Sequence, residues 1–279
     1  MKKTVFAAIL AAISMTAQAY QADCAVSYFD GKAPVITNAK LAQETTPLCF
    51  SEFAVMHSGI SRTPLWSAER LTAERVREAR TLERKDSFHA EPLLSRSERS
   101  ELKDFVRSGY QRGHMSPNGD MTTVESQHES FSLANIVPQN PDNNMHLWAG
   151  IETAVRDLAV RRGELFVITG PLFSGGKLSQ LNDRVLVPTR LFKLVYDPRA
   201  GKGAVYLANN ADGSDYSVIS IAELEEMSGI SFITGMSERT KSAKLPLPAP
   251  DARGYGARHG NHEDQELRSI ARSIHKFIR

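Results

Sequence analysis

Short, mostly apolar runs bounded by turn residues occupy much of the second half of the chain, as is typical of β-strands. They predict strands at residues 165–169, 184–196, 203–208 and 217–221, with a turn at 209–213 between the last two. An earlier strand pair is predicted at residues 52–56 and 63–67, around Gly59. Strands joined by loops, together with one long helix, indicate an α+β fold with a mostly antiparallel central sheet flanked by helices.

The long helix is predicted between Asp142 and Arg162, where apolar residues recur every three or four positions. Pro141 precedes the segment, Asp142 or Asn143 can cap its first turn, and Gly163 ends it. The apolar side chains on its core-facing side are Leu147, Ile151, Ala154, Val155 and Leu158.

Beside this apolar stripe, Asn144, Trp148, Glu152 and Arg156 follow one another at four-residue spacing. Successive members turn by about 40°, so they form one ridge that rises roughly 18 Å along the helix. Because the ridge is too long for one ion, Asn144 could bind a metal directly, Glu152 through metal-bound water, and Arg156 a phosphate. The alternative is a solvated face with a Glu152–Arg156 ion pair, and spacing alone does not separate the two interpretations.

The other segments have weaker patterns. Residues 20–49 are predicted to form an amino-terminal arm, and residues 68–103, rich in Glu, Arg and Ser, a solvated connection with some helix. Residues 50–245 form the domain that holds the predicted strands. Residues 246–279 follow as a loop and a basic amphipathic helix at 263–278, for which packing against the domain is favoured over contact with a membrane or nucleic acid.

The first residues have the pattern of a secretory signal peptide. Lys2 and Lys3 precede an apolar run that ends at Met15, and the small-residue pattern Ala17-Gln18-Ala19 follows. The run is shorter than the roughly 20 residues of a membrane-spanning helix, and no later segment supplies one. We therefore expect a signal peptide at residues 1–19 and an exported protein, periplasmic or extracellular, without a membrane span.

The two cysteines, Cys24 and Cys49, both follow the predicted cleavage site. In an oxidising compartment they are predicted to form a disulfide, with two free thiols as the alternative. A bridge that closes a loop of this size could contribute about 3 kcal/mol in the chain-entropy model.

Overall charge does not point to a nucleic-acid partner. The whole sequence has a formal charge of +2, and the predicted signal peptide carries two lysines and no acids, so the mature chain is neutral. Any surface that binds phosphates must therefore be a local patch. The segment from Gly170 to Gly176 has neither the lysine nor the following helix of a phosphate-binding loop.

His114 is the first candidate for chemistry, in the run Gly109-Tyr110-Gln111-Arg112-Gly113-His114-Met115-Ser116-Pro117. It lies where a strand is predicted to pass into a loop. One ring nitrogen could face a water there and the other a backbone carbonyl, as in a general base. The alternative is a structural histidine, the commoner role of a lone histidine, and this run alone does not decide.

Several short motifs follow one another along the chain. They are Ser61-Arg62-Thr63-Pro64-Leu65-Trp66, the Gln111 to Pro117 run, Leu133-Ala134-Asn135-Ile136-Val137-Pro138-Gln139, the helix set of Asn144, Trp148, Glu152 and Arg156, Thr169-Gly170-Pro171-Leu172-Phe173, and Val187-Pro188-Thr189. In order and spacing they resemble the DNA/RNA non-specific endonuclease family of ββα-metal (His-Me finger) nucleases. The resemblance covers residues 50–240 and implies a ββα-metal active-site motif within the α+β fold.

The resemblance implies a metal-dependent endonuclease that hydrolyses phosphodiester bonds of DNA and RNA. His114 matches the general base that takes a proton from the attacking water. Asn144 matches the one direct protein ligand of Mg²⁺, with Mn²⁺ as the alternative ion, and waters and phosphate oxygens would complete its coordination. Glu152 matches the carboxylate that orients metal-bound water.

Arg62, Arg112 and Arg156 match arginines around the phosphate, where a planar guanidinium can meet two oxygens and stays charged. DNA and RNA would then be bound through phosphate contacts, so cutting should be nearly blind to sequence and weakened by salt. The implied products carry a 5′-phosphate and a free 3′-hydroxyl. The sequence identifies no inhibitor protein.

One position departs from the family pattern, because Gln111 stands where the family typically has aspartate before Arg-Gly-His. A carboxylate could help orient His114 and stabilise its protonated form, whereas an amide brings no charge. Two rival hypotheses follow from single features. Gln111 is compatible with a catalytically impaired nucleic-acid-binding module on the same fold, and His259, His262 and Glu263 with a zinc hydrolase, although no His-Glu-x-x-His helix accompanies them.

Overall fold

The computed structural model describes residues 24–251. The signal peptide predicted at residues 1–19, the helix predicted at 263–278 and the histidines His259 and His262 lie outside the described residues. Within residues 24–251, no helix combines the length and the apolar character needed to cross a membrane.

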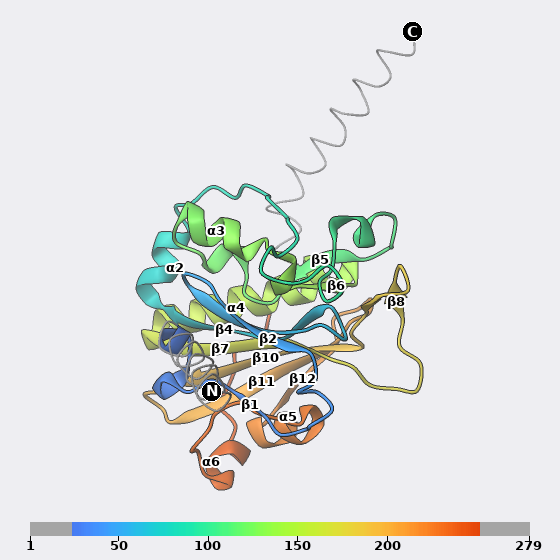
Figure 1. Cartoon of the computed structure of the whole chain (residues 1–279). Helices are drawn as coiled ribbons and strands as arrows, with labels where there is room; N and C mark the ends of the chain where they lie inside the picture. The colour runs from blue at the N-terminus through green and yellow to red at the C-terminus, as the bar shows by residue number, and fades with distance from the viewer. Residues whose placement is uncertain (1–23, 252–279) are drawn as a thin grey trace, which may run out of the picture.

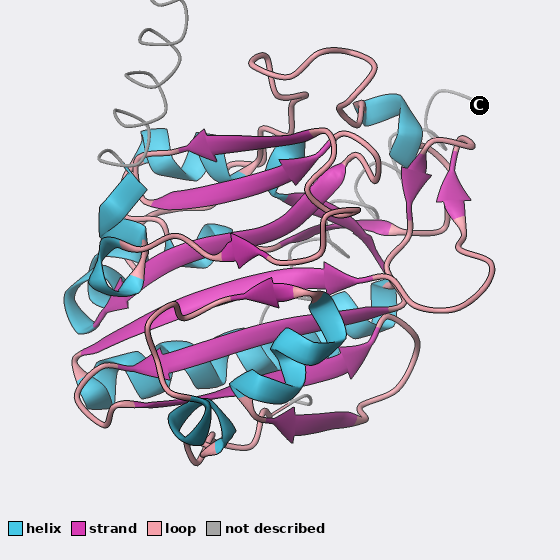
Figure 2. Ribbon diagram, turned by 60° about the horizontal axis from the view of Figure 1, so that its bottom comes forward, coloured by secondary structure: helices cyan, strands magenta, loops and turns pink. Residues whose placement is uncertain are grey.

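A seven-stranded sheet forms the centre of the molecule, and each neighbouring pair of its strands is antiparallel (Figures 1 and 2). In spatial order the strands are β12 (Tyr216–Ile219), β11 (Lys202–Asn209), β10 (Arg190–Asp197), β7 (Glu164–Leu172), β4 (Thr63–Thr72), β3 (Phe53–Ser58) and β2 (Thr45–Cys49). The α+β prediction with a mostly antiparallel sheet is therefore confirmed.

Helices cover both faces of this sheet because its central strands are apolar on both sides. On β7, Leu165 and Val167 contact the helix α4 (Ala149–Arg162), while Phe166 and Ile168 face the opposite layer. Figure 1 shows α4 and α2 (Ala73–Ala79) on one side, with α5 (Ile221–Ser228) and α6 (Glu238–Ser242) on the other. The core therefore has two layers with the sheet between them.

Smaller elements complete the chain. Three two-stranded ladders pair β1 (Val35–Ile36) with β13 (Ile230–Ser231), β5 (Gln111–His114) with β6 (Ile136–Gln139), and β8 (Gln180–Leu181) with β9 (Val185–Leu186). Short 3₁₀ turns are η1 (Ala25–Ser27), η2 (Phe29–Gly31), η3 (Leu102–Phe105), η4 (Asn118–Asp120) and η5 (Leu133–Asn135), and α3 spans Val124–Ser130.

The long helix forms where it was predicted, but its first part is wider than an α-helix. Residues Asn143–Trp148 form a π-helical segment, η6, which continues into α4 and ends at Gly163 with φ 90°. The predicted apolar stripe is buried. Trp148 is also fully buried and packs in that core, so its assignment to a polar ridge was wrong.

Three other segments differ from the sequence-based expectation. The predicted arm at 20–49 contributes β2, which is one of the two edge strands of the central sheet. The strand predicted at 184–196 is two strands, because Pro188 lacks the N–H that a continuous ladder needs. The strand predicted at 217–221 ends at Ile219, since Ser220 caps α5 in a capping box with Glu223.

Cys24 and Cys49 form a disulfide, with 5.6 Å between their Cα atoms. The bridge joins the segment before η1 to the end of β2 and confirms the predicted pairing. Cys24 is buried in the core layer on the α5 side of the sheet, together with Tyr28 and Trp66.

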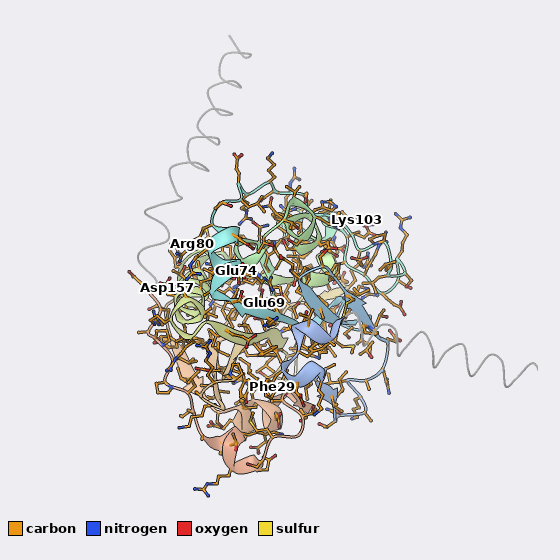
Figure 3. The ribbon with its side chains drawn as sticks, turned by 90° about the vertical axis from the view of Figure 1, so that its left-hand side faces the viewer. Phe29, Glu69, Glu74, Arg80, Lys103 and Asp157 are labelled. Carbon is orange, nitrogen blue, oxygen red and sulfur yellow. A yellow bond between two sulfur atoms is a disulfide. The ribbon has the colours of Figure 1, made fainter. Side chains whose placement is uncertain are left out.

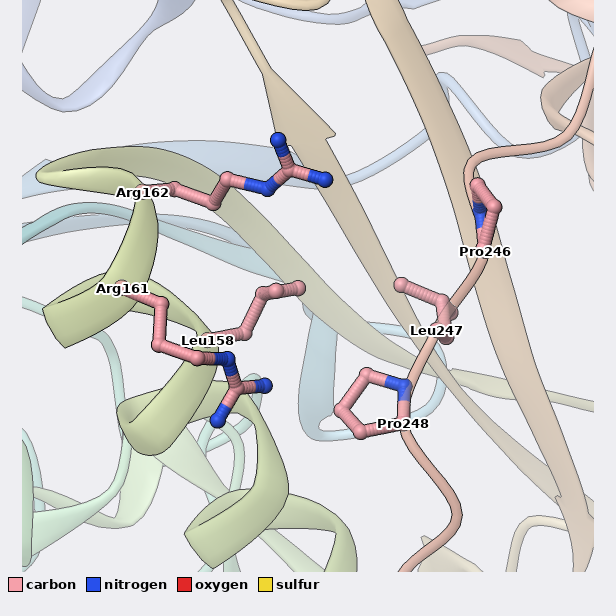
Figure 4. Close-up of a pocket in the computed structure, with 6 residues that line it drawn as sticks. All are labelled: Leu158, Arg161, Arg162, Pro246, Leu247 and Pro248. Carbon is pink, nitrogen blue, oxygen red and sulfur yellow. The ribbon is translucent and has the colours of Figure 1, made fainter.

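The segment after α6 crosses the far end of α4. Tyr206 donates its hydroxyl to the Pro248 carbonyl at 2.6 Å. The shallow groove between this segment and α4 is lined by Leu158, Arg161, Arg162, Pro246, Leu247 and Pro248 (Figure 4). Arg161 lies seventeen positions after Asn144, so the groove is about 25 Å along the helix from that residue.

Candidate active site

A β-hairpin followed by a helix positions the predicted site residues. In the hairpin, Gln111 is opposite Gln139 and His114 is opposite Ile136. The chain then passes directly from β6 into η6 and α4, as Figure 1 shows. Residues 115–135, which include α3, connect the two strands, and the short step from β6 into the helix places the His114 and Asn144 segments next to one another.

The buried side chain of Asn135 ties this hairpin to the sheet. Its Oδ1 accepts from Ser67 Oγ on β4 at 2.8 Å and from Ser116 N at 3.0 Å. Its Nδ2 donates to the carbonyls of Ser116 and Ser130 at 2.9 and 3.0 Å. The Met115 N–H also donates to the Asn135 carbonyl at 2.9 Å, so the turn after His114 is fixed on both sides.

His114 is the last residue of β5, at the strand-to-loop passage predicted for it. Its ring lies against two phenylalanines, 5.4 Å from Phe88 and 5.1 Å from Phe131 between centroids. Burial lowers its pKa to about 3, and the positive charges of Arg84 and Arg112 act in the same direction. Its Nε2 is buried without a hydrogen-bond partner among the described residues. The ring is therefore neutral, which is the form that can accept a proton.

Two arginines approach this aromatic pair from outside. The guanidinium carbon of Arg112 lies 4.1 Å from the Phe88 ring centroid, and that of Arg84 lies 5.5 Å from the Phe131 centroid. Arg84 is half-exposed and ion-paired with Asp86 at 2.7 Å. Sequence analysis missed Arg84, because it lies in an arginine-rich stretch where no motif distinguishes it.

Asn144 lies in the second position of η6 and is partly buried. Its Nδ2 donates to Gln111 Oε1 at 2.8 Å, which leaves Oδ1 with no hydrogen bond among the described residues. An accessible amide oxygen is a suitable ligand for a hard divalent cation that keeps most of its waters. Within residues 24–251, no group of three or more His, Cys, Asp or Glu residues is arranged to hold a metal.

Glu152 and Arg156 lie one turn apart on α4, and both are largely buried. Their side chains are 3.4 Å apart, and Arg156 Nε is 2.5 Å from Asp120 Oδ1. Burial raises the pKa of Glu152, while the charges of Arg156 and Lys193 oppose that shift. The ion pair considered from the spacing is present, but it lies on an enclosed face and not on a solvated one.

Polar side chains also lie beneath the site, on the sheet face that α4 covers. Lys193 on β10 is fully buried, donates to Thr169 Oγ1 at 2.7 Å, and lies 5.5 Å from the Trp148 ring centroid. Glu69, which Figure 3 labels, lies on β4 and is fully buried, and this burial together with nearby Asp120 raises its pKa. The sequence signal for this layer is a lysine within the apolar run of β10, but no polar layer was predicted from it.

Arg62 lies in the turn between β3 and β4, at a φ of 56°. Its Nε donates to the Ser97 carbonyl at 2.8 Å, and its Nη1 donates to the Arg184 carbonyl at 2.6 Å. The structure therefore joins Asn144 to Gln111, Glu152 to Arg156, and His114 to Arg112 through Phe88. Arg62 is held by a separate set of backbone carbonyls.

A histidine at the end of a β-hairpin, followed by a helix that presents an asparagine, defines the ββα-metal (His-Me finger) class. The sequence profile described as DNA/RNA non-specific endonuclease matches residues 32–239. The chain belongs to this family.

Similar proteins include "Nuclease EXOG, mitochondrial" of Danio rerio, which is 31% identical over 214 residues, 69% of this chain and 62% of that protein. "Nuclease" of Nostoc sp. is 30% identical over 225 residues, which are 74% of this chain and 80% of that protein. The crystal structure of the EndoG/EndoGI complex contains a chain with TM-score 0.64 and 25% identity, which covers 72% of this chain and 92% of that one. The chain spans 62% of the Danio rerio relative and 59% of the Xenopus laevis one.

Proposed function

We propose that this protein is a metal-dependent endonuclease that hydrolyses DNA and RNA without sequence preference. One observation carries the proposal. The neutral ring of His114 ends the hairpin of a ββα unit whose helix presents the available Oδ1 of Asn144. Membership in the family supports the same activity.

In this proposal the neutral His114 ring accepts a proton from the water that attacks phosphorus. The water oxygen forms a bond to phosphorus, the bond from phosphorus to the 3′-oxygen breaks, and the departing 3′-oxyanion takes a proton from a solvent water to become a hydroxyl. The products are a 5′-phosphate and a 3′-hydroxyl. Asn144 Oδ1 would hold Mg²⁺, or Mn²⁺ in its place, and the ion would supply positive charge to the phosphate.

The remaining predicted residues position and stabilise these groups. Glu152 has its carboxylate beside Arg156, and it orients water next to Asn144. Arg112 is exposed and lies near His114 through Phe88, which suits contact with a substrate phosphate. Arg62 and Arg156 add positive charge for the same anion, and both are already held in fixed positions.

We also propose that the protein is exported, with residues 1–19 as a signal peptide. The disulfide between Cys24 and Cys49 supports an oxidising compartment, because such bridges are rare where thiols are kept reduced.

Closed circular plasmid and a structured RNA test the proposed activity, with and without EDTA and over a range of salt. We expect both to be cut in Mg²⁺ at many positions, with 5′-phosphate ends and with a rate that falls as salt rises. Binding to both substrates without cleavage under any divalent metal would instead support the impaired binding module considered from Gln111.

A further inference from the structure

Gln111 stands where aspartate is typical of the family. Its side chain is hydrogen-bonded to Asn144 and, among the described residues, not to His114. Gln111 and His114 are three positions apart on β5, so the alternation of side chains along a strand places them on opposite faces. The described contacts agree, since Gln111 Oε1 accepts from Asn144 Nδ2 at 2.8 Å. In this chain the residue at position 111 is therefore a hydrogen-bond partner of Asn144.

This hydrogen bond determines which atom Asn144 presents to a cation. An asparagine amide has one acceptor and one donor end, and only the oxygen can ligate a hard cation. An acceptor at position 111 holds the Nδ2 end, which turns Oδ1 away from Gln111 and leaves it without a partner among the described residues.

In the adjacent glutamine–asparagine pair, Gln139 and Asn143, the glutamine is the hydrogen-bond donor and the asparagine the acceptor. Gln139 faces Gln111 across the hairpin, and its Nε2 donates to Asn143 Oδ1 at 2.7 Å. Asn143 is fully buried, and its Nδ2 donates to the Asn209 carbonyl at 3.0 Å. Both ends of the Asn143 amide are thus used within the fold, so of the two neighbouring asparagines only Asn144 offers its oxygen.

A glutamine can reverse its role in a way that an aspartate cannot. If its terminal amide turns over, Gln111 presents a donor to Asn144, which favours the arrangement with Oδ1 facing Gln111. The Nε2 of Gln111 makes no hydrogen bond within the described part of the chain, so no neighbour there prevents this rotation. An ionised carboxylate accepts only, and it also adds negative charge near the cation.

We propose that Gln111 is a positioning residue that turns Asn144 Oδ1 toward the metal, and that its amide holds the ion more weakly than an aspartate at the same position. The inference rests on the proposed function, because it assigns Asn144 as the metal ligand. It concerns the affinity of the site for the ion and not the affinity for nucleic acid.

Metal affinity without substrate tests this inference. Mn²⁺ binding is measured by the electron paramagnetic resonance signal of the free ion, and Mg²⁺ binding by calorimetry, on the metal-free wild type, Gln111→Asp, Gln111→Leu and Gln139→Leu. We expect Gln111→Leu to weaken both ions about tenfold or more. Gln111→Asp should tighten them severalfold, and Gln139→Leu, which loses the same kind of bond beside Asn143, should keep wild-type affinity.

With plasmid as substrate, the metal concentration at half-maximal rate should shift in the same order while KM for DNA at saturating metal stays constant. Equal affinity of Gln111→Leu and wild type, or weaker binding by Gln111→Asp, overturns the inference even if the wild type cuts DNA. If the wild type neither binds a divalent ion nor cuts, the proposed function itself fails. Should Gln111→Leu not fold, Gln111→Asp alone still decides, because aspartate retains an acceptor at this position.

Discussion

At the scale of single residues, the surroundings of His114 determine the pH at which its ring is protonated. The neutral ring is the form that accepts a proton, and burial together with Arg84 and Arg112 lowers its pKa to about 3. Protonation therefore occurs well below the ordinary value, and the ring stays neutral from pH 5 to pH 8. We expect the His114 ring ¹⁵N resonances of the metal-free protein to show no titration over that range.

The same resonances in urea provide the control, since the unfolded chain should titrate near the ordinary value of about 6.5. An NMR midpoint near 6.5 in the folded protein would contradict this account of the ring. It would also predict loss of cleavage below pH 6 through protonation of the base.

A second prediction at this scale concerns Asn135, whose four hydrogen bonds join β4 to the turns at Ser116 and Ser130. Asn135→Ala leaves several buried groups unpaired and should lower the free energy of unfolding by about 3 kcal/mol. Urea unfolding measures this loss. Asn38→Ala removes only one exposed bond, to Lys40 N, and should change stability by less than about 0.5 kcal/mol. Equal effects of the two substitutions would refute the structural role of Asn135.

Residues whose type suggests a chemical role could be found from the sequence, but not all of their contacts could. His114, Asn144, Glu152 and Arg156 could be named from motifs. The target of Gln111 and the approach of Arg84 could not, because each depends on how separate segments meet in space. Lys193 illustrates the same limit, since its partner Thr169 lies on a neighbouring strand and twenty-four positions away.

At the scale of elements, periodicity identified the long helix but not its π-helical start. The widened turns of η6 break the α-helical register, so a regular four-residue spacing does not describe the relation of Asn144 to Glu152. Trp148 was misassigned because spacing alone does not say which face a wide helix buries. In the structure it packs in the core. Pro188 can interrupt a strand and Ser220 can cap a helix, and both are visible in the sequence. The apolar runs around them nevertheless favoured the prediction of continuous strands.

The cap of α5 gives a prediction that separates stability from activity. Ser220 Oγ accepts from the Glu223 N–H, and the Glu223 carboxylate accepts from the Ser220 N–H. Ser220→Ala should lower the free energy of unfolding by about 1 kcal/mol. Cleavage should be unchanged, because α5 covers the sheet face opposite the ββα unit (Figure 1). Ser217→Ala on exposed β12 serves as the control, and a loss of kcat in Ser220→Ala without a loss of stability would contradict the layer arrangement.

At the scale of the whole molecule, the sheet separates a layer that carries chemistry from a layer that carries stability. The disulfide belongs to the second layer, with Cys24 packed on the α5 side. Replacing both Cys24 and Cys49 by serine should lower the free energy of unfolding by about 3 kcal/mol. Metal affinity and kcat should remain, as measured on folded protein at low temperature. A variant with full stability but impaired cleavage would show that the two layers are not separate.

The overall architecture followed from the sequence because short apolar runs and the turn residues between them specify local strands. Strand order did not follow, and β2 was missed because its five residues include Pro47 and only one fully buried side chain. An edge strand needs less apolar character than a central strand, so its pattern is weak. Motif order supplied what periodicity lacked, and it placed the hairpin and the helix in one unit.

His114→Ala compared with wild type on supercoiled plasmid tests the central claim most directly. Both proteins are assayed in Mg²⁺ and in EDTA, after Mn²⁺ binding has shown that their metal sites are equally filled. We predict that the wild type cuts only with metal and that His114→Ala is slower by at least about 100-fold, the contribution of a positioned general base. Cleavage by His114→Ala at the wild-type rate, with equal metal binding, would contradict the account.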